Sequence, residues 1–258
     1  MRTALTIAGS DSGGGAGIQA DLKTFAAHGV FGLSAVTAIT AQNTLGVSAS
    51  AALDPALVTA QVDAVAADLP IHAVKIGMLA NRHIIAAVAD ALVRHGLGPV
   101  VLDPVMLAKG GARLLADDAV AALRHLLLPL ATLVTPNTEE AATLAGRPVR
   151  TLVEARSAAE IIRAAGARAV LVKGGHLDGP AIDVLADGAG IVEFRQERVE
   201  TRHTHGTGCT LSSAIAARLA HGDDLRTAIA SAKSYVTRAI LQAPGLGHGH
   251  GPLNHFPT

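Results

Sequence analysis

The sequence predicts an α/β fold, with a central, mostly parallel sheet, helices on both faces of the sheet and a small appended β-hairpin. Uninterrupted apolar runs at residues 100–102, 133–134 and 169–172 are typical of strands that are buried on both sides. The stretches between these runs carry apolar residues at helical spacing, and strands that alternate with helices form βαβ units. The chain of 258 residues can bury a large core, and we expect one domain over residues 1–258.

Caps and apolar periodicity indicate the helices. Asp54 followed by Pro55 is typical of an N-cap with proline at the first helical position, and one apolar face then continues to Leu69. Thr151 and Glu154 form a capping-box pattern at the start of another helix. Helices are therefore expected at about 55–69, 84–93, 120–127, from 151 onward, at 208–220 and at 225–242.

A hairpin is predicted where the alternation of strands and helices is interrupted. Two β-like stretches, at about 181–185 and 191–199, are joined by Asp187 and Gly188, a common hairpin turn. We expect this hairpin to extend the parallel sheet at one edge.

Composition excludes several classes of function. The chain has 21 basic and 21 acidic residues without a run of like charges, so we expect no nucleic-acid partner and no membrane partner. No apolar run reaches the roughly 18–20 residues that span a bilayer, and the first strand begins too early for a signal peptide. The single cysteine excludes an internal disulfide, and a cytoplasmic location is expected.

Polar and chain-bending residues follow four of the predicted strands. Ligands of open α/β sheets bind in the crevice beyond the carboxyl ends of the strands. Ordinary turn chemistry explains any one of these segments, but four together predict a site at that edge of the sheet. The segments are 75–78, 103–106, 135–137 and 173–176.

A glycine-rich segment at residues 9–17 follows the first strand directly. Gly15, Gly17 and Ala20 loosely match a dinucleotide-binding pattern, but the second strand, ending at 41–43, offers no acid for a ribose. We therefore interpret the glycines as allowing close approach of the backbone to a small ligand.

Residues 205–209 predict a phosphate cradle of a type other than the Walker A loop, which the sequence lacks. Gly206, Thr207 and Gly208 can direct successive backbone N–H groups toward one point, and the helix that follows adds the positive end of its dipole. Such a site suits a phosphoryl group during transfer. The alternative is a plain glycine-rich start of a helix.

Cys209 lies in the first turn of that helix. Helix N-termini lower the pKa of thiols, which predicts a thiolate or polarised thiol here. The alternative is a buried cysteine that acts as a small hydrophobic residue.

Two acidic residues are candidates for binding Mg²⁺. Glu140 lies three residues after Asn137, which is a capping-box pattern and also a way to place a carboxylate near the sheet edge. Asp103, at the end of a predicted strand, is the second candidate, for metal binding or for positioning water. Histidines within 248–255 lack the rigid framework of a zinc site, and zinc is not favoured.

Taken together and in order, these motifs resemble those of the ribokinase-like superfamily. More narrowly, the chain resembles the hydroxymethylpyrimidine/phosphomethylpyrimidine kinases of thiamine biosynthesis. The resemblance is continuous over nearly the whole chain and covers the segments 5–11, 14–24, 41–44, 75–79, 101–106, 135–137, 173–176, 204–210 and 247–256.

The resemblance implies a fold and a reaction. The family has a mostly parallel sheet with helices on both faces, and it transfers phosphate from MgATP to an aminopyrimidine alcohol and then to its monophosphate. The cofactors implied are ATP and Mg²⁺, and a homodimer is the expected assembly.

The resemblance also implies roles for the cradle and the substrate site. Cys209 stands where related kinases carry an aspartate base, and Gly206, Thr207 and Gly208 form the anion hole before it. Gln42 matches the residue that reads the ring nitrogen and amino group of the pyrimidine, because an amide donates and accepts at once. Three further positions are expected beside the substrate, namely Gly9, Asp21 and Met78.

For the nucleotide, the resemblance implies a second set of residues. Asn137 and Glu140 match a motif associated with Mg²⁺ and phosphate, and Lys173 is expected near the ATP phosphates. The segment 106–111 reads as a loop that can close over the phosphates, and we expect Lys109 to contribute there.

Two alternatives remain beside the pyrimidine kinase. A pyridoxine or pyridoxal kinase shares the glycine-rich segment and the cradle, but Gln42 favours an aminopyrimidine edge. A non-catalytic pyrimidine-binding protein would have no need of Cys209, Asp103, Glu140 and the cradle glycines.

Overall fold

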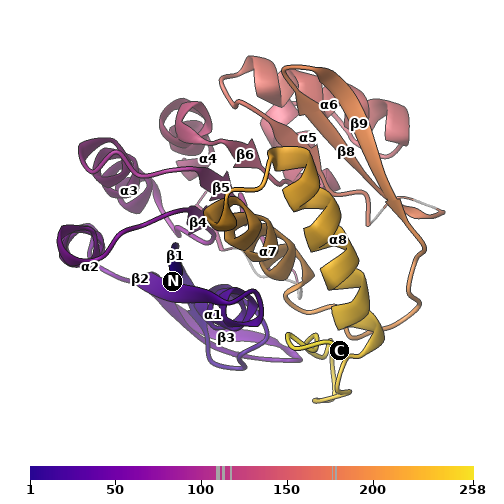
Figure 1. Ribbon diagram of the computed structural model, residues 1–258, viewed down its shortest axis with the longest axis horizontal. Helices are drawn as coiled ribbons and strands as arrows, with labels where there is room; N and C mark the ends of the chain where they lie inside the picture. Colours follow the sequence, from indigo (N-terminus) through magenta and orange to yellow (C-terminus); the bar gives the residue numbers. More distant parts are fainter. Residues whose placement is uncertain (109–110, 112–113, 117, 176, 178) are drawn as a thin grey trace.

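The computed structural model describes residues 1–108, 111, 114–116, 118–175, 177 and 179–258. Over these residues, nine strands form one sheet in the order β3-β2-β1-β4-β5-β6-β7-β8-β9 (Figure 1). Six neighbouring strands run parallel: β2 (Val30–Asn43), β1 (Arg2–Asp11), β4 (Val74–Ile76), β5 (Val100–Leu102), β6 (Leu133–Val134) and β7 (Val170–Val172).

Antiparallel strands extend the parallel block at both edges. β3 (Gly46–Ala52) pairs with β2, and the hairpin of β8 (Ala181–Asp187) and β9 (Gly190–Gln196) pairs with β7. The predicted α/β class, the mostly parallel sheet and the appended hairpin are thus confirmed. The continuous sheet supports one domain over residues 1–258, which stays a prediction.

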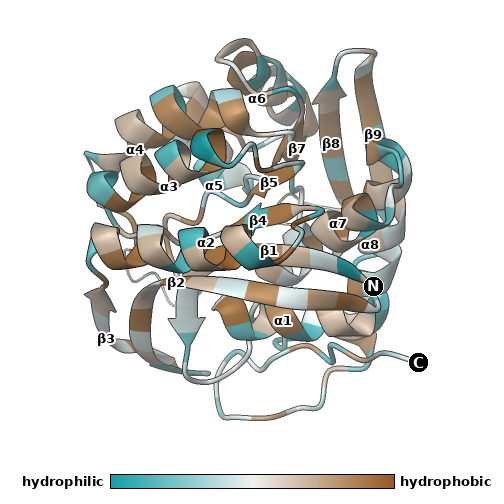
Figure 2. Cartoon of the chain, turned by 60° about the vertical axis from the view of Figure 1, so that its left-hand side comes forward, coloured by the Kyte–Doolittle hydropathy of each residue, from teal (hydrophilic) through white to brown (hydrophobic). Residues whose placement is uncertain are grey.

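Helices cover both faces of the sheet, and the colouring of Figure 2 shows both apolar and polar stripes on them. On one face lie α2 (Pro55–Asp68), α3 (Arg82–Arg94), α4 (Ala119–Ala122), α5 (Thr138–Ala145) and α6 (Leu152–Ala164). On the other lie α1 (Gly17–Ala27), α7 (Thr207–His221) and α8 (Leu225–Leu241). Within the described ranges, none of the helices is both long and apolar enough to cross a bilayer.

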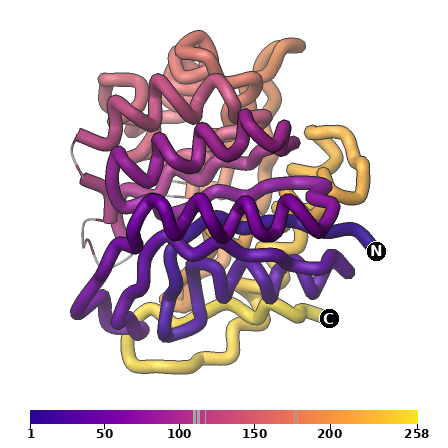
Figure 3. Tube along the Cα trace, turned by 90° about the vertical axis from the view of Figure 1, so that its left-hand side faces the viewer, coloured from indigo at the N-terminus to yellow at the C-terminus, as the bar shows by residue number. Residues whose placement is uncertain are grey.

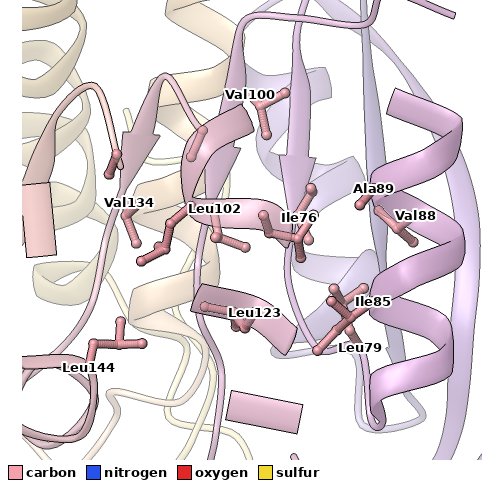
Figure 4. Close-up of a cluster of buried hydrophobic side chains, with 14 of the residues drawn as sticks. Ile76, Leu79, Ile85, Val88, Ala89, Val100, Leu102, Leu123, Val134 and Leu144 are labelled. Atoms are coloured by element: carbon pink, nitrogen blue, oxygen red, sulfur yellow. The ribbon is translucent and has the colours of Figure 1, made fainter. Parts of the chain in front are cut away.

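The core consists of two apolar layers, because successive strand residues point to opposite faces. On β5, Val101 packs under α7 and α8, whereas its neighbours Val100 and Leu102 join the layer under α2–α6. Figure 4 shows part of this second layer, with Ile76 of β4 between Leu102 and the side chains of α3. The sheet is therefore covered on both sides, as the uninterrupted apolar runs predicted.

Several elements differ from the sequence-based prediction, and α1 is one of them, since no helix was expected after the glycine-rich segment. β3 was not anticipated, because its small residues are mostly exposed and show no apolar alternation. The helix expected over 120–127 is α4 continued by a π-helical turn, Leu123–Leu127, and a 3₁₀ turn, Leu128–Leu130. Pro129 lies in that last turn and cannot continue an α-helix, which accounts for the end of the element.

The parallel strands bring their carboxyl ends to one edge of the sheet. The backbone N–H of Asp103 donates to Ile76 (2.8 Å), that of Thr135 to Leu102 (2.9 Å), and that of Lys173 to Pro136 (2.8 Å). The segments that follow β4, β5, β6 and β7 are thereby held side by side, which confirms the convergence expected from the sequence.

A buried ion pair connects the hairpin to α8. Lys233 Nζ lies 2.6 Å from Asp183 Oδ2, and both side chains are less than a tenth exposed. Asp183 also accepts the backbone N–H of Gly174 at 2.9 Å.

Replacing Lys233 with methionine leaves the Asp183 carboxylate buried without its cation. We expect a loss of about 3–5 kcal/mol in the free energy of unfolding, measured by urea denaturation. The double variant Asp183→Asn/Lys233→Met removes both charges and should recover part of that loss. Arg238→Met, on an exposed position of α8, is the control and should change stability by less than about 0.5 kcal/mol. A Lys233→Met variant as stable as the control would contradict the assignment.

Candidate active site

The cradle at the start of α7 rests on a close contact between the two glycine-rich segments. Gly206 is the N-cap of α7 and has a left-handed backbone, with φ of 81°. A Cβ atom at Gly206 would overlap the carbonyl oxygen of Gly15, so only glycine allows this approach. The first N–H groups of a helix have no partner within the helix, and those of α7 begin beside the 9–17 segment. The glycine-rich start of a helix that the sequence predicted is therefore present, and its role as a phosphate cradle stays a prediction.

The hydroxyl groups near the cradle fix it to the sheet. Ser212 Oγ donates to the carbonyl oxygen of Gly208 at 2.9 Å and lies 2.9 Å from the hydroxyl of Thr135 at the end of β6. Thr207 Oγ1 donates to the carbonyl oxygen of Thr204 at 2.8 Å. These bonds hold the first turn of α7 over the carboxyl ends of the strands.

A lysine and two carboxylates lie next to the cradle. Lys173 Nζ is 2.7 Å from Asp103 Oδ1 and 3.9 Å from Glu140 Oε2. A Cβ atom at Gly208 would stand 3.1 Å from that ammonium group and 3.6 Å from Asp103 Oδ2. Burial lowers the pKa of Lys173, but the charges of Asp103 and Glu140 outweigh it and raise the pKa above its ordinary value. Lys173 is thus a fixed cation at the mouth of the cradle.

Glu140 has both of the properties that the sequence suggested. It completes a capping box, since its carboxylate accepts the N–H of Asn137 at 2.7 Å while Asn137 Oδ1 accepts the N–H of Glu140 at 2.9 Å. Burial raises the pKa of Glu140 to about 7, although Lys173 opposes that rise. The cap therefore places a partly desolvated carboxylate beside Lys173 and Asp103.

The donor set at this edge fits a cation that arrives with a nucleotide. Within the described ranges, no group of three or more His, Cys, Asp or Glu residues could hold a metal ion by itself. Mg²⁺ commonly takes one or two carboxylates and completes its shell with phosphate oxygens and water. Asp103 and Glu140 can supply such carboxylates, whereas the histidines of the 248–255 segment form no cluster.

Cys209 differs from the sequence-based expectation. Burial raises the pKa of its thiol to about 11, and the carboxylates of Asp21 and Asp103 add to the rise. Lys75 and the backbone N–H of Gly17 act in the opposite direction but do not outweigh burial. The expected lowering by the helix N-terminus is therefore wrong: the structure favours a neutral thiol.

Asp21 and Lys75 form a buried ion pair beneath Cys209. Lys75 Nζ lies 2.9 Å from Asp21 Oδ2, and both side chains are fully buried. Thr6 and Ser213 donate to the same carboxylate at 2.6 Å each. Burial lowers the pKa of Lys75, but Asp21, Cys209 and Asp103 raise it above its ordinary value.

These contacts correct the position expected for Asp21. Its carboxylate is saturated by three side-chain donors inside the core, so it supports the site from behind instead of facing a substrate. Lys75 was expected among the polar residues at the carboxyl end of its strand, but its ammonium group lies against Gly77 and is enclosed. Sequence reasoning missed this layer, because the pairing of residues 54 positions apart has no local signal.

Gln42 lies beside His205 at the edge of the cradle. Its Nε2 atom is 3.2 Å from His205 Nε2, which is also 2.9 Å from Asp11 Oδ2. A small hollow of about 20 Å³ adjoins Gln42 and His205 and is bounded by residues 43–47, Ala108 and His250. His205 opens the predicted cradle segment and Asp11 lies in the first glycine-rich segment, but the sequence did not predict that these two side chains meet beside Gln42.

The remaining predicted residues fall into two groups. Gly9 and Met78 lie against each other, since a Cβ atom at Gly9 would stand 2.9 Å from Met78 Sδ. Met78 is held by its carbonyl oxygen, which accepts the hydroxyl of Thr37 at 2.6 Å. Lys109 lies outside the described residues.

The C-terminal segment closes one side of the site. The backbone N–H of His250 donates to the carbonyl oxygen of Thr44 at 2.9 Å. The backbone N–H of His205 donates to the carbonyl oxygen of Gly251 at 3.1 Å. Gly249 packs so closely on the backbone of Thr44 that a Cβ atom would overlap it. Figure 3 shows this segment, in yellow, passing the loops of the N-terminal third. The glycines of the tail are thus explained by packing.

The pKa of Cys209 can be measured directly, because Cys209 is the single cysteine of the chain. Its rate of alkylation by iodoacetamide should still be rising at pH 10, and at neutral pH it should be about 100-fold below that of the guanidinium-unfolded chain. Because the folded protein favours the neutral thiol, Cys209 contributes to the stability of the fold. That contribution is fully present below pH 9.0 and is lost as pH rises toward about 11. A plateau with a midpoint below pH 8 would contradict the burial argument.

Comparison with known proteins extends these observations. Residues 11–254 match the model of the phosphomethylpyrimidine kinase family. The chain is 56% identical over 257 residues to the hydroxymethylpyrimidine/phosphomethylpyrimidine kinase of Rhizobium meliloti, covering 98% of this chain and 96% of that protein. It is 53% identical to the thiamine biosynthesis bifunctional protein ThiED of Geobacter sulfurreducens, and there the match covers 98% of this chain but only 52% of the relative.

Comparison with a solved structure supports the fold. An ADP complex of Bacillus subtilis pyridoxal kinase superposes with a TM-score of 0.92 and 41% identity, over 99% of this chain and 97% of that one. This likeness confirms the ribokinase-like architecture expected from the motifs. With the family model covering nearly the whole chain, the protein belongs to the phosphomethylpyrimidine kinase family.

Proposed function

We propose that the protein phosphorylates 4-amino-5-hydroxymethyl-2-methylpyrimidine with ATP, and then phosphorylates the monophosphate to the pyrophosphate, in thiamine biosynthesis. The observation that carries the proposal is the arrangement at one sheet edge. The backbone cradle of Gly206, Thr207 and Gly208 stands between the cation Lys173 and the amide Gln42.

The cradle and Lys173 would hold the phosphoryl group in flight. Phosphoryl transfer has a loose transition state, so fixed donors and cations supply most of the catalysis. The hydroxymethyl oxygen attacks the γ-phosphorus in line, the bond to the ADP oxygen breaks, and the hydroxyl proton passes to an oxygen of the transferred phosphoryl group. Backbone N–H groups at the start of α7 and the ammonium group of Lys173 stabilise the charge that this step distributes.

Magnesium would enter as part of MgATP. Asp103 and Glu140 are the carboxylates that would hold it, directly or through water, and Asn137 keeps Glu140 in place through the cap. When bound, the ion neutralises phosphate charge. The ADP complex of the Bacillus subtilis pyridoxal kinase supports the use of an adenine nucleotide in this fold.

Cys209 would position the hydroxyl group instead of removing its proton. A thiol with a pKa of about 11 is almost wholly neutral at pH 7. A loose transition state needs little general-base assistance, so a neutral thiol that lines the cradle is compatible with turnover.

Substrate choice would come from Gln42, with Gly9 and Met78 forming the floor next to the ring. An amide can donate to the ring nitrogen and accept from the amino group of an aminopyrimidine. Activity on pyridoxal is the second candidate, supported by 41% identity to a pyridoxal kinase. The absence of an amino group beside the pyridoxal ring nitrogen makes it the poorer match to Gln42.

The setting of the enzyme completes the proposal. The lone reduced thiol and the use of ATP fit a cytoplasmic enzyme. A homodimer is proposed from the family resemblance, and size-exclusion chromatography with light scattering tests it.

The reaction is tested by a coupled ADP-release assay with the pyrimidine alcohol, its monophosphate and pyridoxal. We expect turnover with both pyrimidines and a lower kcat/KM for pyridoxal. Glu140→Gln should lower kcat at least about 10-fold and raise the Mg²⁺ concentration needed, because a carboxylate at the phosphates is lost. Glu139→Gln, an exposed neighbour on the same turn of α5, is the matched control and should leave both unchanged. No turnover with any of the three substrates would favour a pyrimidine-binding protein.

A further inference from the structure

A chain of polar groups runs from the end of β1 through His205 to the end of β2. Asp11 Oδ2 lies 2.9 Å from His205 Nε2, and the same ring nitrogen lies 3.2 Å from Gln42 Nε2. On its other side, Gln42 Oε1 lies 3.3 Å from Thr40 Oγ1, which in turn donates to the carbonyl oxygen of Ser10 at 2.8 Å. Each hydrogen in this chain can be assigned by following the donors and acceptors from one end.

Asp11 determines the proton on His205. The carboxylate of Asp11 accepts three backbone N–H groups, from Gly13 and Ala16 at 2.8 Å and from Gly15 at 3.1 Å. Burial would raise the pKa of Asp11, but the bonds from His205 and from this backbone lower it below its ordinary value. An ionised carboxylate is only an acceptor, so Nε2 of His205 must carry a hydrogen. The other tautomer would place two lone pairs 2.9 Å apart.

The assigned proton sets the orientation of the Gln42 amide. With its nitrogen toward His205, two donors would face each other at 3.2 Å. Its oxygen would then face Thr40 Oγ1, whose hydrogen is already given to Ser10. Turning the amide by 180° removes both conflicts: the oxygen shares the hydrogen of His205 Nε2 with Asp11 Oδ2 in a three-centre bond, and the nitrogen donates to Thr40 Oγ1. The oxygen and nitrogen of an amide are assigned from such networks, since their shapes are nearly identical.

We propose that His205, held by Asp11, is a positioning residue that fixes the Gln42 amide and thereby selects substrates with an aminopyrimidine edge. In the fixed orientation one lone pair of the oxygen and one N–H remain free. The hollow described above is lined by both Gln42 and His205. The N–H pairs with a ring nitrogen and the oxygen with an adjacent amino group, whereas the reversed amide would oppose both.

This inference rests on Gln42 as the substrate contact of the proposed function, and it adds a reason why the preceding histidine accompanies the cradle. A freely rotating glutamine would accept either order of donor and acceptor on a ring. A glutamine with one orientation discriminates, because a mismatched substrate leaves polar groups unpaired.

A matched pair of variants tests the proposal. His205→Gln can place an amide nitrogen where Nε2 lies and keeps the donor to Gln42, whereas His205→Asn ends near the position of Nδ1 and loses it. Dissociation constants are measured by calorimetry for two ligands, the hydroxymethylpyrimidine with its 4-amino group and the same pyrimidine without it. The ratio of the two constants reports how strongly the protein reads the amino group.

We expect the ratio to fall about 10- to 100-fold in His205→Asn and to stay within about threefold of wild type in His205→Gln. Equal weakening of both ligands in His205→Asn would overturn the proposal, because a merely structural histidine affects them alike. Gln42→Ala distinguishes a failure of the proposed function from a failure of this inference. An unchanged ratio in Gln42→Ala would refute Gln42 as the substrate contact. A ratio that falls in Gln42→Ala but stays at the wild-type value in His205→Asn would refute only the positioning role of His205.

A second measurement reads the tautomer in the wild-type protein itself. The ¹⁵N shifts of the His205 ring in the wild-type protein, assigned by comparison with His205→Gln, should show hydrogen on Nε2 and not on Nδ1 alone. A neutral ring with its hydrogen on Nδ1 would overturn the proposal directly.

Discussion

The contact of Gly206 with the carbonyl oxygen of Gly15 is the constraint on which the site depends. It joins the loop after β1 to the start of α7, two segments from opposite ends of the chain, with no space for a side chain between them. The left-handed backbone of Gly206 then turns the chain into α7, so that the helix begins beside the glycine-rich loop after β1. The same contact brings His205 to Asp11 and Gln42. The predicted phosphate cradle and the proposed substrate contact thus both depend on one close approach of the backbone.

Two lysine–carboxylate groups lie next to the cradle, one enclosed in the core and one at the sheet edge, and they have different electrostatic roles. Asp21 and Lys75 are enclosed in the core beneath Cys209, where their charges offset each other and their hydrogen bonds fix β1, β4 and α7. Lys173, with Asp103 and Glu140, lies at the mouth, where a phosphate and its cation could replace contacts between protein groups. A rigid inner pair and an outer set of exchangeable ligands are what a site for transient, multiply charged groups requires.

Much of this arrangement was predictable from the sequence, because it follows from local rules. Strands with uninterrupted apolar runs predicted a parallel sheet, and the polar residues after them predicted the edge at which Asp103, Asn137 and Lys173 meet. The capping box of Glu140 was likewise visible from its spacing. The glycine-rich segment after β1 predicted close approach of the backbone to a small ligand, whereas the structure shows that the two glycine-rich segments approach each other.

The failures at the site share a physical cause, which is burial decided by residues far away in the chain. Nothing near Asp21 or Lys75 in the sequence shows that they pair in the core. The thiol of Cys209 was expected to be acidic from its place in α7, but the packing around it raises its pKa instead. β3 was not predicted for a different reason, because an exposed edge strand of small residues has no apolar pattern.

The most direct test is a crystal structure with ADP, aluminium fluoride and the hydroxymethylpyrimidine. The fluoride complex should lie within hydrogen-bond distance of the N–H groups at the start of α7 and of Lys173 Nζ, with the pyrimidine hydroxyl in line and its amino group on Gln42. A fluoride complex bound away from α7, or a pyrimidine that does not touch Gln42, would contradict the account.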